Sequence, residues 1–144
     1  MADLLLIASL AGRRIAFPAS EVEAVVELDG LTPAPRAAGH VAGLSALRSR
    51  VLTVIDGLAS LEFGRSASAG LNEAIVVPSG GHTYALLVDN VEDVIEAAAP
   101  PAPVGAPLGA GWDRVALGMV EAEGELFLLV DPHALIAGPA ARAA

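Results

Sequence analysis

Short apolar runs separated by glycine-containing turns constrain the fold of this chain more than any other feature. Each run is only a few residues long, which suits a β-strand and is too short for a core helix. The turns place glycine where a hairpin needs a positive φ, as in Ala11-Gly12, Ser79-Gly80-Gly81 and Glu123-Gly124. We predict strands over Leu4–Leu10, Ile15–Phe17, Val22–Glu27, Val51–Ile55, Ala74–Val77, Tyr84–Val88, Val91–Glu96, Ala116–Val120 and Leu126–Val130.

Strands at this spacing predict an all-β fold, either a barrel or a sandwich, rather than alternating strands and helices. Short helical turns are expected over Gly57–Leu61 and Pro132–Ile136. In the second of these, Asp131 can cap the helix and Pro132 suits its first position. Stretches rich in Pro and Ala over 31–39 and 98–111 are predicted to be extended connectors. The tail over 138–144 is predicted to fray.

An internal repeat becomes visible when the chain is aligned with itself. With an offset of 69 residues, identical residues coincide at Gly12/Gly81, Ala16/Ala85, Val22/Val91, Glu23/Glu92, Val25/Val94 and Glu27/Glu96. With an offset of 75, they coincide at Gly43/Gly118, Asp56/Asp131 and Ala59/Ala134. We predict two copies of one small β unit, over about 4–66 and 73–137, between which strands can be exchanged. Chance similarity between Ala- and Val-rich segments is the alternative.

Composition limits the class of protein. A length of 144 residues, of which 54% are hydrophobic, allows one domain with a substantial core, which we place over 1–137. The net charge of −9 argues against a nucleic-acid partner, because phosphate contacts need a basic surface. It also argues against docking on anionic lipid. A seam between two repeated units is a frequent place for a binding groove.

The amino-terminal apolar run does not have the order of a signal peptide. Asp3 precedes the run and Arg13-Arg14 follow it, and the run is too short to span a bilayer. The chain has no cysteine, which removes disulfides, thiolate metal sites and a cysteine nucleophile. We therefore expect a cytoplasmic protein without membrane insertion.

Candidates for catalysis are few. His40, His82 and His133 are scattered without the spacing of a metal site or a triad, and solvent exposure accounts for the last two. Asp56, Asp89 and Asp131 each end an apolar strand, and we interpret them as structural caps.

A pair of strand-end carboxylates, Asp56 and Asp131, leaves a small aspartate-dependent hydrolase as an alternative. Such a dyad needs a small hydroxyl residue and then glycine after each aspartate, whereas Gly57-Leu58 and Pro132-His133 follow here. We predict a binding protein without catalysis, metal or cofactor.

The order of four segments resembles the CheW-like domain of bacterial chemotaxis coupling proteins. These are VEAVVEL at 22–28, GLSALRSRVLTVIDGLASL at 43–61, YALLVDNVEDVIE at 84–96 and LFLLVDPHALI at 126–136. The most specific piece is Gly-x-x-x-Leu-Arg at 43–48, followed by a β run that ends in Asp56. The resemblance extends from about Leu4 to Ile136.

The resemblance implies two SH3-like five-stranded barrels that act as an adaptor without catalysis. The implied partners are the regulatory domain of the histidine kinase CheA and the cytoplasmic tip of a chemoreceptor. Positions that match the receptor-binding groove of the family are Val25, Glu27, Gly43 and Arg48.

Each of these residues has an implied role. The Arg48 guanidinium can grip carboxylates or carbonyls, and Gly43 lets a receptor helix approach the backbone. Val25 supplies apolar contact and Glu27 a polar rim. Arg50 has no counterpart in the family, so we interpret it as a solvated charge.

Three residues depart from the family pattern. Ser49 stands where Gly is usual, Thr53 where Pro is usual and Gly57 where Leu is usual. They leave open a diverged CheW-like protein that modulates another sensor kinase or competes in the signalling array.

Overall fold

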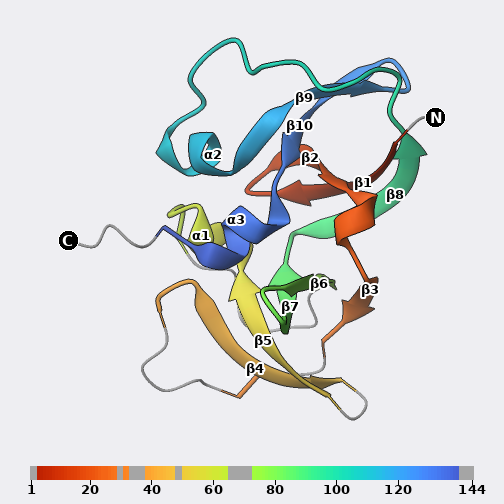
Figure 1. Cartoon of the computed structure of the whole chain (residues 1–144). Helices are drawn as coiled ribbons and strands as arrows, with labels where there is room; N and C mark the ends of the chain where they lie inside the picture. The colour runs from red at the N-terminus through yellow and green to blue at the C-terminus, as the bar shows by residue number, and fades with distance from the viewer. Residues whose placement is uncertain (1–2, 29–30, 33–37, 48–49, 65–72, 140–144) are drawn as a thin grey trace.

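The structure is a computed structural model that describes residues 3–28, 31–32, 38–47, 50–64 and 73–139 (Figure 1). The strands are β1 (Leu4–Leu10), β2 (Arg13–Pro18), β3 (Ala24–Glu27), β4 (Val41–Leu47), β5 (Arg50–Asp56), β6 (Glu73–Ser79), β7 (His82–Leu87), β8 (Asn90–Glu96), β9 (Ala116–Ala122) and β10 (Glu125–Val130). The helices are η1 (Ala19–Glu21, a 3-10 turn), α1 (Gly57–Ser60), α2 (Ala110–Val115) and α3 (Pro132–Ala137). Within these residues, none of the helices has the length and apolar character needed to cross a membrane.

The strands form two five-stranded sheets. Sheet A has the order β8-β1-β2-β10-β9, and sheet B has the order β3-β6-β7-β5-β4. In Figure 1 sheet A lies above sheet B, and the short helices α1 and α3 lie at the junction between them. The prediction of an all-β fold built from two five-stranded units is confirmed.

Strand bounds recur along the chain at the offsets seen in the sequence. Moved by 69 residues, β1 coincides with β6 and β2 with β7; moved by 75, β4 coincides with β9. Sheet A nevertheless joins β1 and β2 to three strands of the second half, and sheet B joins β6 and β7 to three strands of the first. Within each sheet, a parallel strand pair connects the two halves of the chain: β2 with β10 in sheet A and β5 with β7 in sheet B. Neither half of the chain can therefore complete a sheet alone.

The core has three parts. A central cluster takes side chains from both sheets and from α2 and α3, among them Phe17, Leu86 and Leu135. A second cluster uses residues of sheet A, such as Phe127, and a third gathers sheet B residues around Leu52. Strands such as β1 are thus covered on both faces, which explains why they are apolar throughout rather than alternating.

Each unit has a glycine at the same position of the repeat, where a neighbouring segment of the chain approaches the strand closely. Gly43 in β4 and Gly118 in β9 have φ values of +152° and +151°. A Cβ atom there would lie 2.6 Å from the carbonyl oxygen of Thr32 or of Ala102, respectively. These carbonyls belong to segments that bridge to β4 and β9, so only glycine lets each segment approach.

The structure corrects three predicted elements. Val41–Leu47 was not predicted as a strand, because Gly43 and Ser45 interrupt its apolar pattern, yet it forms β4 against β5. The strand predicted from Val22 begins at Ala24, since Val22 caps η1, with its N–H bonded to the carbonyl oxygen of Ala19. The connector predicted over 98–111 gives way to α2 at Ala110, because Trp112 is buried on that helix. Residues 33–37 of the other connector and 140–144 of the tail lie outside the described residues.

Replacement of Gly118 by alanine should lower the free energy of unfolding by about 2–3 kcal/mol, since strain at positive φ adds to a backbone clash. Gly124 provides the matched control, with φ +77° and no atom within 4 Å of a Cβ. Gly124→Ala should cost only about 1 kcal/mol. Urea unfolding followed by the fluorescence of the single tryptophan measures both values, and equal losses would contradict the contact with Ala102.

Candidate protein-binding site

Strand β3 carries two of the four predicted receptor-binding residues on the surface. β3 lies at the edge of sheet B and pairs only with β6. Val26 points into the sheet B cluster, and alternation along the strand places Val25 and Glu27 on the opposite face. Val25 is 41% exposed, and Glu27 is exposed as well.

Val25 is the outer end of an apolar row that crosses sheet B. It lies opposite Ile75 in β6, Ile75 lies opposite Leu86 in β7, and Leu86 lies opposite Ile55 in β5. The last three are buried in the central cluster between the sheets. Val25 therefore extends the apolar layer at the seam to solvent, where a partner side chain can cover it.

Gly43 has a different setting from the one expected. It lies on β4, at the other end of the sheet B strand order from β3. Its open side faces Thr32, whose carbonyl oxygen occupies the space that a side chain would need. The close backbone approach that Gly43 permits is made by the chain itself.

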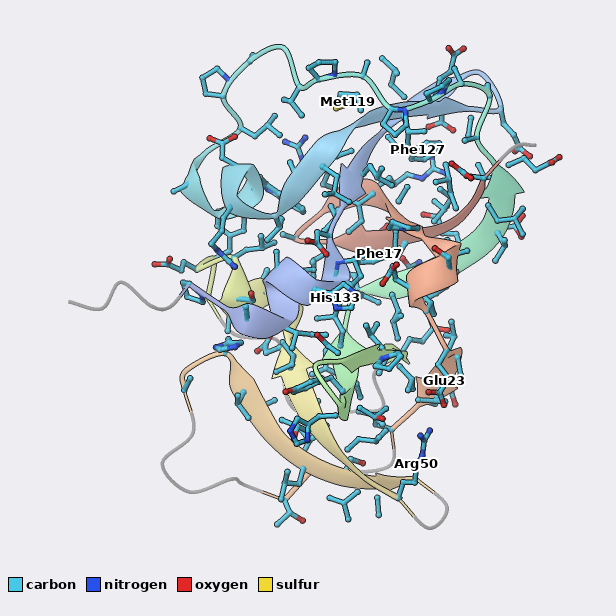
Figure 2. The ribbon with its side chains drawn as sticks, viewed as in Figure 1. Phe17, Glu23, Arg50, Met119, Phe127 and His133 are labelled. Carbon is cyan, nitrogen blue, oxygen red and sulfur yellow. The ribbon has the colours of Figure 1, made fainter. Side chains whose placement is uncertain are left out.

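Arg48 and Ser49 lie outside the described residues, but the strands on either side of them are placed. In the β4–β5 register Leu47 lies opposite Arg50. Arg50 Nη2 is 2.7 Å from Glu23 Oε2, just before β3 (Figure 2). Arg50 is thus half-exposed and ion-paired rather than simply solvated. The pair holds the end of the β4–β5 hairpin beside the start of β3. We call Glu23, Val25, Glu27 and Arg50 the β3 surface.

The repeat supplies a counterpart to the β3 surface that sequence reasoning did not single out. Val94 on β8 is 49% exposed and lies opposite Leu6, a member of the central cluster. It stands 69 residues after Val25, so the offset between the two copies was the signal that could have identified it.

Two residues before Val94, Glu92 belongs to a cluster in which one arginine pairs with two carboxylates. Arg14 Nη2 is 2.9 Å from Glu92 Oε1, and Arg14 Nη1 is 2.5 Å from Glu125 Oε2. Hydrogen bonds from Arg14 lower the pKa of Glu92, and those with Glu92 and Glu125 raise the pKa of Arg14. The cluster ties β2 to β8 and β10 on the surface of sheet A.

Two of the three histidines, His40 and His133, form hydrogen bonds within the fold. His40 is buried, and its Nε2 lies 2.8 Å from the carbonyl oxygen of Ile136. His133, which was expected to be solvent-exposed, is partly exposed and lies 2.9 Å from Ser79 Oγ and 2.6 Å from Glu21 Oε1. This chain of hydrogen bonds joins α3, the end of β6 and η1, the turn that leads into β3. His82 is exposed at the start of β7.

The three strand-end aspartates hold backbone groups. Asp56 accepts hydrogen bonds from the N–H groups of Leu58 and Ala59, and Asp131 accepts one from His133 N–H. These contacts cap α1 and α3. Asp89 differs, because β8 rather than a helix follows it; its carboxylate accepts a hydrogen bond from Gly12 N–H in the β1–β2 turn.

Chemistry at these carboxylates has little support from the geometry. In Asp56 and Asp131, the pair considered as a catalytic dyad, Oδ1 of each carboxylate accepts hydrogen bonds from backbone N–H groups at the start of a helix. Within the described residues, no three His, Asp or Glu side chains gather as a metal site. In the same part of the chain, every buried side-chain polar atom has a hydrogen-bond partner.

Comparison with known proteins identifies a family and similar solved structures. Residues 4–140 match the family model of the CheW-like domain. The crystal structure of the scaffolding protein TtCheW from Thermoanaerobacter tengcongensis is similar, with a TM-score of 0.79 and 21% sequence identity. The match covers 94% of this chain and 92% of that chain. No sequence among curated proteins matches the chain.

Asp131→Ala should lower the free energy of unfolding by about 1 kcal/mol, because the N-cap hydrogen bond is lost. Asp131→Asn keeps an oxygen acceptor at the cap and should leave stability almost unchanged. Thermal unfolding by circular dichroism measures both variants. An equal loss in the two would indicate that the charge, not the cap, matters.

The Arg14–Glu92 pair should make part of the stability sensitive to acid. The pKa of Glu92 is lowered in the folded state by its hydrogen bonds with Arg14. Glu92 therefore stabilises the fold at pH values above its unfolded-state pKa, and this effect is lost as the pH falls through its folded-state pKa. Glu92→Gln should therefore be less stable than the parent near pH 6, and the difference should be smaller at pH 3, below the ordinary glutamate pKa of about 4.3. Urea unfolding at both pH values tests this; a difference that persists undiminished at low pH would contradict the assignment.

Proposed function

Because this chain belongs to the CheW-like domain family, we propose that it is a non-catalytic adaptor that couples chemoreceptors to the histidine kinase CheA. The observation that carries the proposal is the family match over residues 4–140, which includes strands of both sheets. We take its partners to be the regulatory domain of CheA and the cytoplasmic tip of a receptor.

We assign receptor binding to the β3 surface together with Arg48. A receptor helix laid along this surface would cover Val25 and extend the apolar layer that already fills the seam. Glu27 would remain at the rim, and Arg48 would donate to carboxylates or to carbonyl groups at the end of a helix. A contact of this size is modest, so binding by one domain is weak and gains from many copies in an array.

An adaptor must also hold its two partners at a fixed relative position. The exchange of strands meets this need, because each sheet contains hydrogen-bonded strands from both halves of the chain. Relative movement of the sheets would have to break either these pairs or the central cluster. We infer that a partner on one sheet is linked to a partner on the other without a hinge.

The absence of catalysis in this proposal is supported by the use of the polar side chains. Asp56, Asp131 and His40 each make contacts that stabilise backbone groups. A measurable hydrolytic activity that disappears in Asp56→Asn would overturn this part of the proposal.

Val25→Asp should weaken binding to a receptor cytoplasmic fragment by about tenfold or more, because a charge would be buried against the partner. Arg48→Glu should act in the same direction through repulsion. Val94→Asp is the matched control, since Val94 has similar exposure at the equivalent position of the other sheet. Biolayer interferometry with immobilised receptor fragment measures all three, and unchanged binding by Val25→Asp and Arg48→Glu would sink the assignment.

Kinase binding should be independent of these changes. The same three variants should retain the parent affinity for the CheA regulatory domain in the same assay. No detectable binding of the parent protein to any CheA regulatory domain of its own organism would point to another partner kinase.

A further inference from the structure

An aromatic pocket lies on the helical side of the seam, away from β3. It has a volume of about 550 Å³ and is lined by Ala11, Gly12, Arg13, Leu58, Phe63 and Trp112. Its walls come from the β1–β2 turn, from α1 with the residues after it, and from α2. In Figure 1 α1 and α2 lie on the left of the molecule and β3 on the right. We call this the aromatic pocket.

The aromatic pocket presents a large apolar side chain to solvent on a buried support. Phe63 is 51% exposed, whereas Trp112 is 4% exposed. Their ring centroids are 6.3 Å apart with an angle of 51° between the planes. Aromatic residues make up only 3% of the chain, and two of its five aromatic side chains meet at this place. Exposed aromatic side chains on a rigid base are typical of binding surfaces.

Arg13 gives the aromatic pocket a positive charge. Its guanidinium carbon lies 5.2 Å from the centroid of the Trp112 ring. Among the described arginines, Arg14 and Arg50 form ion pairs and Arg114 donates to backbone carbonyls. Arg13 has no ion pair within the described residues. A guanidinium stacked on a ring keeps its N–H edge available, and a carboxylate is the ligand that fits that edge.

The internal repeat shows that Phe63 and Leu58 are not part of the pattern that the two copies share. Features that the fold needs occur in both copies, such as Gly43 and Gly118. The copy of Phe63, 75 residues later, is Gly138, and the copy of Leu58 is His133. The apolar side chains of Phe63 and Leu58 therefore have no counterparts at the matching positions of the second copy.

Two of the three described non-glycine residues with positive φ lie at or beside the aromatic pocket, and the third, Glu123, lies in the β9–β10 turn. Ala11 and Glu62 have φ values of +54° and +65°, which side chains other than glycine rarely adopt. Ala11 lines the pocket, and Glu62 precedes Phe63. The equivalent of Ala11 in the second copy is Gly80, which adopts φ +59° without a side chain. Such strain costs about 1 kcal/mol or more and is often retained where it serves binding.

We propose that the aromatic pocket binds a partner polypeptide segment in which an apolar side chain is flanked by carboxylates. The apolar side chain packs on Phe63 and over Trp112, and a carboxylate accepts hydrogen bonds from Arg13. Glu62, which precedes Phe63, interacts with the Arg114 guanidinium, whose pKa is lowered by burial and raised by Glu62. This site is separate from the β3 surface, so an adaptor can hold this third segment together with its other partners.

The single tryptophan of the chain makes the test direct, since Trp112 lines this pocket and a segment bound there would alter its fluorescence. The probe is a blocked hexapeptide with a central Leu-Phe pair and two glutamates on each side; the comparison peptide has lysines in place of the glutamates. We expect a saturable change in Trp112 fluorescence with the acidic peptide and at least about tenfold weaker binding of the basic one. Anisotropy of a labelled peptide gives the same affinities independently.

Variants locate the contact. Arg13→Glu and Phe63→Ala should each weaken binding of the acidic peptide by about tenfold, and Phe63→Leu should restore most of it. Leu126→Ala is the control, because Leu126 is a highly exposed apolar residue on β10 outside this pocket. Thermal unfolding confirms that each variant is folded.

Several results would overturn the proposal. They are equal affinity for the two peptides, no saturable change with either peptide at millimolar concentration, and full binding by Phe63→Ala. Concentration-dependent dimerisation that is lost in Phe63→Ala would show that a second copy of the chain is the occupant. Val25→Asp should leave peptide binding intact, so failure here is distinguishable from failure of receptor binding.

Discussion

The parallel pairing of β2 with β10 and of β5 with β7 controls how the two halves of this chain can be arranged. Parallel strands cannot be joined by a tight turn, so each pair brings together residues that are far apart in sequence, such as Ile15 and Leu128. Each sheet is complete only when the other half has contributed its strands. Each unit can therefore form only together with the other. The apolar faces between the two sheets make up the central cluster.

The positions of both proposed binding sites follow from this arrangement. The central cluster is buried where the two sheets face each other. At the edges of the junction between the sheets, apolar side chains next to this cluster reach solvent. On one side Val25 on β3 is exposed, and on another the helices leave Trp112 covered but Phe63 exposed. A protein that binds at such edges meets an apolar surface whose backbone is held by the largest core of the molecule. This is a physical basis for an adaptor that does not change shape when a partner binds.

Polar residues that invite a catalytic interpretation serve local structure instead. Asp56 and Asp131 hold the first N–H groups of α1 and α3, and His133 links Glu21 to Ser79 across three elements. Short helices need such caps more than long ones, because few of their backbone groups find partners within the helix. The same carboxylate position in both copies of the repeat is therefore explained by two short helices that start in the same way.

The sequence by itself determined the all-β class, the turns and the repeat, because glycine at positive φ and short apolar runs act locally. The resemblance to the CheW-like family singled out Val25 and Glu27, and alternation along β3 places both side chains on one face of the strand. The sequence did not identify β4 as a strand, because Gly43 and Ser45 break the pattern and only pairing with β5 and contact with Thr32 explain them. Only the tertiary structure decided which sheet each strand joins and which side chains meet, as in Arg50 with Glu23 or Arg13 with Trp112. Such contacts form between residues that are far apart in sequence, and their free energy depends on closing long loops and on filling a core shared by both sheets. Local sequence patterns do not predict this free energy.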